Sequence, residues 1–193
     1  EITDRLIDIM TDKKICKHLH IPLQSASDKV LRDMNRPYNS VFFARKVESI
    51  RKKLGDSVGI YSDVIVGFPT EEESDFKMTD KFVKDLELSG LHVFTFSKRP
   101  DTVAWYMNDL PERVKKERSI IMHETDRKLR ERFKTARVGK TLEVLILKKN
   151  KDGAVGLSSE FIDVLSNDEL ISNEFYTVVG VKATDKYLYV HKV

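Results

Sequence analysis

Residues 18–28 read HLHIPLQSASD, and residues 35–38, six positions further on, read NRPY. The first stretch is typical of an apolar strand that ends in small and polar side chains and then turns into a helix. Proteins of the α/β class place their chemistry at such strand ends, because the carboxyl ends of parallel strands meet at one edge of the sheet. The stretch therefore predicts an α/β fold with a functional site near Gln24, Ser25 and Ser27.

Two more strand-and-helix units follow along the chain. Strands are predicted at 18–23, 58–68 and 91–96, the second with a continuous apolar run that indicates burial on both faces. Alternating units predict parallel β/α packing with right-handed crossovers. Three units are too few for a barrel of eight, so an open sheet and part of a barrel remain the alternatives.

The predicted helices differ in length and pattern. They cover 3–12, a short segment from the cap Ser27 to Met34, 39–54, and a segment from about 70 to Ser89 that Gly90 ends. The third helix has apolar residues near helical spacing. These residues are Phe42, Phe43, Val47, Ile50 and Leu54.

The last part of the chain changes character. One long charged helix is predicted from Glu112 to Arg137, with a narrow stripe formed by Val114, Ile121, Thr125, Leu129 and Phe133. Short strands separated by turn residues then predict a small antiparallel barrel. These strands are 142–147, 154–157, 161–165, 176–183 and 187–191. A boundary near Val138 divides the chain into domains 1–137 and 138–193.

Composition limits the class of protein. The 193 residues are 40% hydrophobic and 34% charged, as in ordinary soluble domains. No apolar run approaches the ~18 residues of a membrane span, and the first residues lack the layout of a signal peptide. We therefore expect a cytoplasmic protein without membrane contact.

A single cysteine, Cys16, excludes an internal disulfide framework. It also excludes a self-contained iron–sulfur site, since a [4Fe–4S] cluster is typically held by three or four thiolates. Cys16 itself is expected to be a small buried residue before the first strand.

Basic charge is concentrated in one segment. Residues 112–137 hold ten basic and five acidic residues, whereas residues 138–193 hold seven and eight. The helix at 112–137 is therefore either an RNA-binding surface or a solvated face, since phosphate contacts dominate nucleic-acid affinity.

His18 and His20 lie two positions apart, so on a strand they face the same side. They form either a metal-binding pair or polar residues inside a barrel. No third ligand is evident nearby in the sequence, which favours the second reading and no metal site.

These motifs resemble the radical S-adenosylmethionine methylthiotransferases, the MiaB-like family. The family usually reads QSGS, DVIVGFPGE and SxRxGT where this chain has Ala26, Thr70 and Asp101 in place of the glycines. Residues 156–164 look like the GxTxNYIxV pattern of the family's TRAM domain, a small barrel that holds tRNA. The resemblance implies a partial radical-SAM (TIM-like) β/α barrel followed by a small all-β TRAM barrel.

The resemblance also implies a cofactor site. S-adenosylmethionine would be contacted by strand-end residues, with no catalytic or metal-ligating residue in this chain. These residues are Gln24, Ser25, Ser27, Asp63, Gly67, Phe68, Phe96 and Arg99. Each has a structural alternative, such as a helix cap for Ser27, buried scaffold for Gly67 and a salt bridge for Arg99.

The implied parent enzyme adds a methylthio group to C2 of N6-threonylcarbamoyladenosine beside the tRNA anticodon, using S-adenosylmethionine and two [4Fe–4S] clusters. This branch is favoured by residues 19–22, 91–94 and 156–164. Alternatives are isopentenyladenosine tRNA, a ribosomal protein, or a non-catalytic RNA-binding module. Because the cluster cysteines are absent, we expect an inactive fragment that contacts tRNA through the TRAM domain and self-associates through an open barrel edge.

Overall fold

The computed structural model describes residues 2–193 in two compact units. Among the described residues, one unit comprises 2–19, 50–59 and 130–193, and the other comprises 20–49 and 60–129. The predicted boundary near Val138, which gives two continuous domains, is a different kind of division and stays a prediction.

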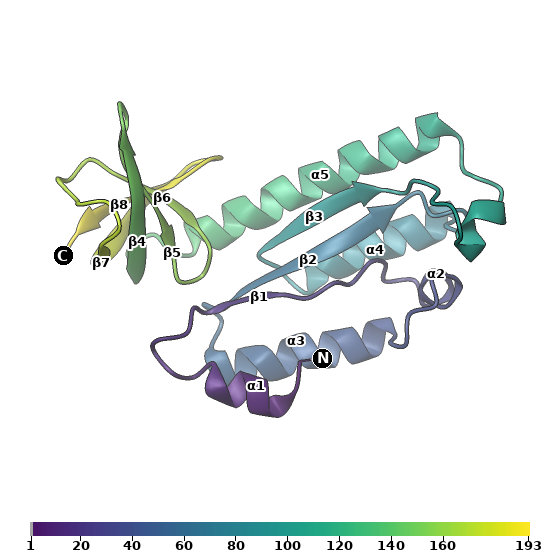
Figure 1. The fold of residues 1–193 in the computed structure, drawn as a ribbon, viewed down its shortest axis with the longest axis horizontal. Helices are drawn as coiled ribbons and strands as arrows, with labels where there is room; N and C mark the ends of the chain where they lie inside the picture. The colour runs from purple at the N-terminus through teal and green to yellow at the C-terminus, as the bar shows by residue number, and fades with distance from the viewer. Residues whose placement is uncertain (1) are drawn as a thin grey trace. The chain divides into compact units, whose positions relative to one another are not determined.

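A three-stranded sheet carries the first part of the chain (Figure 1). Its strands are β1 (His18–His20), β2 (Gly59–Val66) and β3 (Gly90–Thr95), in the order β1-β2-β3. β2 and β3 are parallel, with Tyr61 opposite Gly90 and Val66 opposite Thr95. The predicted parallel arrangement is confirmed.

β1 is shorter than the predicted strand at 18–23. Pro22 has no amide hydrogen to donate, and the amide of Leu23 donates to the Ser62 hydroxyl at 3.0 Å instead of to a strand carbonyl. Gln24 then returns to the ladder as an isolated parallel bridge to Val64. The polar strand end therefore lies beside the middle of β2.

Five α-helices and one short 3₁₀ helix occur among residues 2–193. They are α1 (Asp4–Ile9), α2 (Asp28–Asp33), α3 (Ser40–Leu54), α4 (Glu73–Asp85), η1 (Val103–Tyr106) and α5 (Glu112–Thr135). Ser27 accepts the capping hydrogen bond of α2, as predicted, and Thr3 accepts that of α1. No helix of the described chain is long and apolar enough to cross a membrane.

α4 ends earlier than predicted. It stops at Asp85, Leu86 caps it, and Glu87 adopts a left-handed conformation with φ +51°. Gly90 does not end the helix; it is the first residue of β3. The left-handed residue that follows the end of α4 is therefore Glu87, and not the glycine that the sequence pattern indicated.

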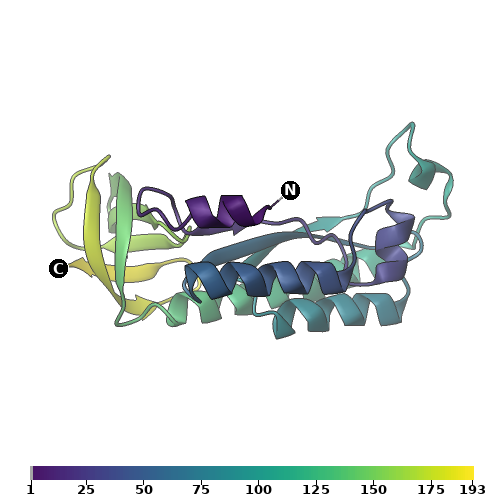
Figure 2. The same cartoon turned by 90° about the horizontal axis from the view of Figure 1, so that it is seen from below.

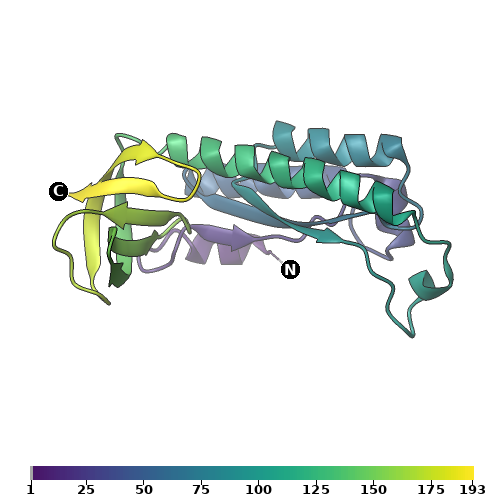
Figure 3. The same ribbon diagram turned by 90° about the horizontal axis from the view of Figure 1, so that it is seen from above.

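The two faces of the sheet differ in burial. Ile60, Val64 and Val66 are at most 1% exposed, whereas Asp63 and Ile65 between them are partly exposed. α4 and the first part of α5 lie on the first of these faces (Figures 2 and 3). The prediction that β2 is buried on both faces is therefore wrong for the other side, here called the open face and formed by His20, Asp63, Ile65, His92 and Phe94.

Both predicted apolar stripes contain errors. In α3 the side chain of Phe42 is 57% exposed, although Phe43, Val47 and Ile50 are buried. In α5 Ile121 is 47% exposed. The prediction is confirmed for Thr125, Leu129 and Phe133, which are buried. The other buried residues of α5 are Lys115, Arg118, Met122 and Lys134. Because the buried face of α5 includes Lys115, Arg118 and Lys134, the spacing of apolar residues alone does not show which face of the helix is buried.

The C-terminal strands close into a five-stranded barrel. They are β4 (Thr141–Asn150), β5 (Gly153–Ser158), β6 (Asp163–Ser166), β7 (Phe175–Ala183) and β8 (Leu188–Lys192), in the order β4-β5-β6-β8-β7. Its core contains Val144, Ile146, Val164 and Leu188, all at 0% exposure. The predicted small barrel is confirmed, but β6 and β8 pair in parallel, so it is not fully antiparallel.

Cys16 is exposed rather than buried. It lies in the irregular segment between α1 and β1, where no element covers its side chain. The expectation of a buried small residue is wrong.

Candidate functional site

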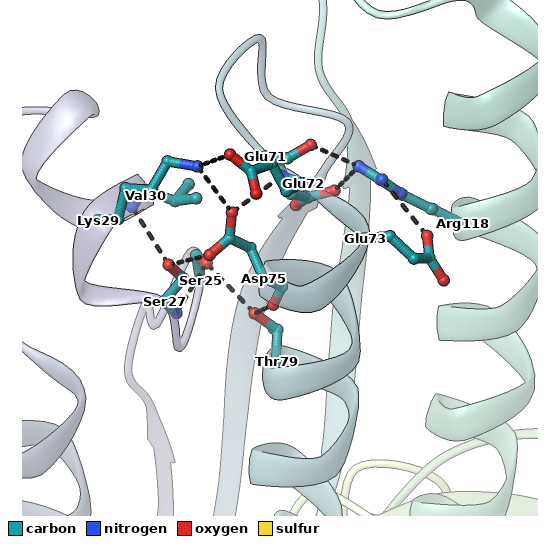
Figure 4. Close-up of polar contacts among 10 residues, drawn as sticks. All are labelled: Ser25, Ser27, Lys29, Val30, Glu71, Glu72, Glu73, Asp75, Thr79 and Arg118. Atoms are coloured by element: carbon teal, nitrogen blue, oxygen red, sulfur yellow. Dashed lines mark hydrogen bonds and ion pairs between the residues drawn. The ribbon is translucent and has the colours of Figure 1, made fainter.

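The strand-end polar residues form one hydrogen-bonded network with α4, here called the strand-end network (Figure 4). The Ser27 hydroxyl donates to Asp75 Oδ1 at 2.7 Å, and the Ser25 hydroxyl lies 3.2 Å from the hydroxyl of Thr79. Ser25 and Ser27 are 0% and 2% exposed. Both hydroxyls are thus engaged inside the protein, and their contact with a cofactor stays a prediction.

Asp75 is the centre of this network. Desolvation acts to raise the pKa of Asp75, but hydrogen bonds from the Ser27 hydroxyl, the Glu72 amide and the Lys29 ammonium together lower it below its usual value. Lys29 Nζ lies 2.7 Å from Glu72 Oε1 and 3.3 Å from Asp75 Oδ2. The network therefore holds the ionised carboxylate of Asp75, in the first turn of α4, against the start of α2.

Gln24 connects the network to the sheet through its backbone. It adopts φ +67°, its amide donates to the Asp63 carbonyl at 2.8 Å, and its carbonyl accepts from the Ile65 amide at 2.9 Å. The residue is 7% exposed. Gln24 therefore adopts a left-handed backbone conformation in a buried bridge, and its contact with a cofactor stays a prediction.

Gly67 follows β2 with φ +79°. A Cβ at this position would lie 2.5 Å from Cγ of Lys115, so a side chain of α5 closely approaches the backbone here. Phe68 is 4% exposed and packs edge-on against Phe96 with ring centroids 5.2 Å apart. Phe96 itself is partly exposed.

A buried ion pair closes the turn after β2 (Figure 4). Arg118 of α5 donates to Glu71 Oε1 at 2.6 Å, and the two side chains are 7% and 2% exposed. Burial raises the pKa of Glu71, against the opposing effect of the Gly67 amide and the Arg118 guanidinium. Glu71 ends the motif at 63–71, but its pairing with Arg118 was not predicted, because a Glu and an Arg 47 positions apart carry no spacing signal.

All three positions where the family has glycine can be assessed by their backbone. Asp101 has φ +63°, so it adopts the conformation that favours glycine, whereas Ala26 and Thr70 are not among the residues with positive φ. Arg99 is exposed, and its carbonyl accepts from the Thr102 hydroxyl at 2.8 Å. The strand-end loop after β3 thus leaves the Arg99 guanidinium accessible.

Arg36, Pro37 and Tyr38 of the NRPY stretch line a cavity of about 480 Å³. Its lining is Asp28, Arg32, Arg36, Pro37, Tyr38, Asn39 and Phe42. The Tyr38 hydroxyl donates to the Pro22 carbonyl at 3.1 Å, which ties this segment to the end of β1. Two arginines beside one carboxylate make the cavity suitable for an anionic group.

The open face brings together a cluster that the sequence did not reveal. His20 Nε2 lies 2.7 Å from Asp63 Oδ1, and His92 Nδ1 lies 3.4 Å from the same oxygen. His18, the expected companion of His20, instead stacks on Phe161 with ring centroids 3.9 Å apart. The third member, His92, comes from β3, and only strand register shows that it faces Asp63.

The residues of this chain suit the two implied cofactors, a [4Fe–4S] cluster and S-adenosylmethionine, to different degrees. Cys16 is the single cysteine of the chain, and a [4Fe–4S] cluster needs three or four thiolates, so the residues present do not fit a cluster. For S-adenosylmethionine, Asp63, Phe96 and Arg99 offer accessible side chains, while both serine hydroxyls are bonded within the protein.

Comparison with solved structures indicates the class of fold. Coproporphyrinogen III oxidase (HemN) of Escherichia coli, a radical SAM enzyme, is similar with a TM-score of 0.52 over 98% of this chain and 48% of its own, at 17% identity. At this identity the likeness concerns the fold alone. The chain has a fold that is found in the radical SAM class.

Sequence comparison then identifies the family. Threonylcarbamoyladenosine tRNA methylthiotransferase MtaB of Aquifex aeolicus is 40% identical over 157 residues, 81% of this chain and 37% of that protein. The tRNA-2-methylthio-N(6)-dimethylallyladenosine synthase of Caldicellulosiruptor saccharolyticus is 36% identical over 194 residues, 98% of this chain and 38% of that protein. The chain belongs to the MiaB-like family of radical SAM tRNA methylthiotransferases, as its motifs predict.

The match concerns part of each relative. The chain spans a little over a third of the length of these curated relatives, 37% and 38%. No protein-family model matches it.

Proposed function

We propose that this chain supplies the later strands of a radical SAM barrel, within residues 1–137, and a TRAM-like domain, residues 138–193, of a tRNA methylthiotransferase. The observation that carries the proposal is the 36% identity to one such enzyme over 98% of this chain, which includes both parts. The parent enzyme would act in the cytoplasm with S-adenosylmethionine and two [4Fe–4S] clusters.

The proposed substrate is N6-threonylcarbamoyladenosine next to the anticodon of tRNA. Residues 19–22, 91–94 and 156–164 support this branch, together with the 40% identity to MtaB of Aquifex aeolicus. A dimethylallyladenosine synthase matches nearly as well, so that tRNA substrate is the first alternative, and a ribosomal protein is the second.

The 193-residue sequence by itself should hold no cluster. We expect anaerobic reconstitution with iron and sulfide to give no stoichiometric cluster absorbance, because one exposed thiolate cannot hold a [4Fe–4S] unit. Cys16→Ser is the matched control and should give the same background spectrum. Stoichiometric cluster absorbance from the unchanged chain would contradict the proposed inactivity.

The barrel is the proposed contact with tRNA. Lys148, Lys149 and Lys151 are all exposed around the β4–β5 turn, and they are the densest group of cations in the barrel. In α5, by contrast, Lys115 and Arg118 are buried and paired with carboxylates, so the helix offers fewer cations than its composition indicates. A non-catalytic RNA-binding module is the functional alternative that this surface also supports.

Titration with unmodified tRNA at several salt concentrations tests the barrel contact. If both lysines contact phosphates, K148E/K149E should weaken binding and lower the slope of log K against log[salt] by about 2. Lys77→Glu, an exposed cation on α4, is the control and should leave both values unchanged. Equal slopes for the chain and the double variant would show that this turn does not bind RNA.

A further inference from the structure

Three side chains from three neighbouring strands meet on the open face. His20 is the last residue of β1, Asp63 lies in β2, and His92 lies opposite Asp63 in the β2–β3 register. One ligand atom of each residue lies within 4.8 Å of the others. Two imidazole nitrogens and one carboxylate oxygen therefore lie close enough together to be shared by one ion.

We propose that His20, Asp63 and His92 bind one divalent transition-metal ion of the Zn²⁺ or Co²⁺ type. Imidazole nitrogen and carboxylate oxygen are common Zn²⁺ ligands, and three protein ligands leave a position for water. Mg²⁺ and Ca²⁺ prefer sites in which all ligands are oxygen atoms, so the two histidine nitrogens make this site unsuitable for either ion.

The distances suit such an ion after a small adjustment. Zn²⁺ binds nitrogen and oxygen at about 2.0–2.1 Å, which separates neighbouring donors of a tetrahedral site by roughly 3.3 Å. The 3.4 Å between His92 Nδ1 and Asp63 Oδ1 already matches this value. The 2.7 Å between His20 Nε2 and the same oxygen must open by about half an ångström, which side-chain rotation can supply.

The site is both held and accessible. The parallel pairing of β2 with β3 aligns Asp63 and His92, and the Ile21 amide donates to the Tyr61 carbonyl at 2.8 Å directly beside His20. The side chains of His20, Asp63 and His92 are 34%, 21% and 48% exposed, so an ion and its water can reach them. The site does not depend on the proposed tRNA activity or on any cluster.

Titration of the full 193-residue chain with Co²⁺ tests the proposal, because the visible d–d bands of Co²⁺ report its coordination. We expect saturation at one Co²⁺ per chain, with bands of the intensity of four- or five-coordinate sites. Zn²⁺ should displace the Co²⁺, and an excess of Mg²⁺ should not.

His92→Gln and Asp63→Asn should weaken Co²⁺ binding roughly tenfold or more, since each removes a ligand where even outer-shell changes cost 10–100-fold. His123→Gln, an exposed histidine of α5, is the matched control and should bind as the unchanged chain does. Circular dichroism checks that each variant folds. Non-saturable binding, effective competition by Mg²⁺, or unchanged affinity in H92Q would overturn the site and leave a purely hydrogen-bonded cluster.

Discussion

Single residues at the end of β2 set the shape of the candidate site. Gly67 combines a left-handed backbone at φ +79° with a direct approach of Lys115 Cγ to 2.5 Å from where a Cβ would lie. Lys115 cannot easily withdraw, because its side chain is 4% exposed and its ammonium lies 3.0 Å from Asp109 Oδ2. Both backbone and packing therefore require glycine at this position.

Gly67→Ala should lower the free energy of unfolding by roughly 2–4 kcal/mol, the sum of left-handed strain and overpacking. Gly55→Ala is the matched control, since Gly55 has φ +83° and no atom within 4 Å of a Cβ. The control should show only the strain, about 1–2 kcal/mol. Chemical denaturation measures both variants, and equal losses would show that Lys115 does not confine Gly67.

At the scale of elements, the Glu71–Arg118 pair joins the turn after β2 to α5. Arg118→Met leaves the buried Glu71 carboxylate without its cation, and such losses cost roughly 3–5 kcal/mol of folding stability at neutral pH. E71Q/R118M removes both charges and should recover part of that loss. Arg113→Met, whose side chain is 83% exposed beside Glu117, should change stability little.

The loss in Arg118→Met should depend on pH. Burial already raises the pKa of Glu71 above its ordinary 4.5, and removing the cation raises it further. A carboxyl with a raised folded-state pKa is least costly when protonated, so its penalty appears as the pH rises through that pKa. The stability difference between the chain and R118M, measured by denaturation, should therefore be larger at pH 7 than at pH 4.5, and the opposite trend would exclude a buried, ionised Glu71.

At the scale of the whole molecule, the sheet has an edge that the barrel lacks. β3 pairs only with β2 among the described strands, whereas each barrel strand has two neighbours. An unpaired strand edge is a template for association with another chain, and a charged residue on it opposes such pairing. Within the described part of the chain β1 also pairs only with β2, so the predicted self-association concerns either edge strand, and β3, with six residues against three, is the longer of the two.

Sedimentation velocity over a range of concentrations should show reversible association of the chain. Thr95→Lys, at the exposed end of β3, should shift the chain toward monomer. Thr177 is exposed on β7, a strand that has a neighbour on both sides in the closed barrel, so Thr177→Lys should leave the association unchanged. Association that both lysine variants weaken equally would assign it to charge rather than to the strand edge.

The order of strands and helices could be predicted because it depends on local patterns. Ser27 before an amphipathic segment, the apolar run of β2 and the turn residues between barrel strands all act within a few positions of the chain. Errors arose where distant residues compete with a local pattern. Ile121 was wrongly included in the stripe of α5, because part of the buried face of this helix is formed by Lys115 and Arg118, whose charges are paired with the carboxylates of Asp109 and Glu71.

The candidate site was predicted less completely. The residue types at the strand ends indicated polar contacts correctly, but their partners Asp75 and Thr79 come from α4 and form a closed network. Whether a serine faces a ligand or a neighbouring helix depends on packing, which carries no signal in the spacing of a single sequence.

The sequence by itself determined the family, the order of elements and the barrel that follows, because motifs, periodicity and turn chemistry are properties of neighbouring residues. Only the tertiary structure decided that Glu71 pairs with Arg118, that Lys115 fills the space above Gly67, and that His92 joins His20 and Asp63. These contacts depend on strand register and helix packing, which bring together residues 29 or more positions apart through burial rather than through local pattern.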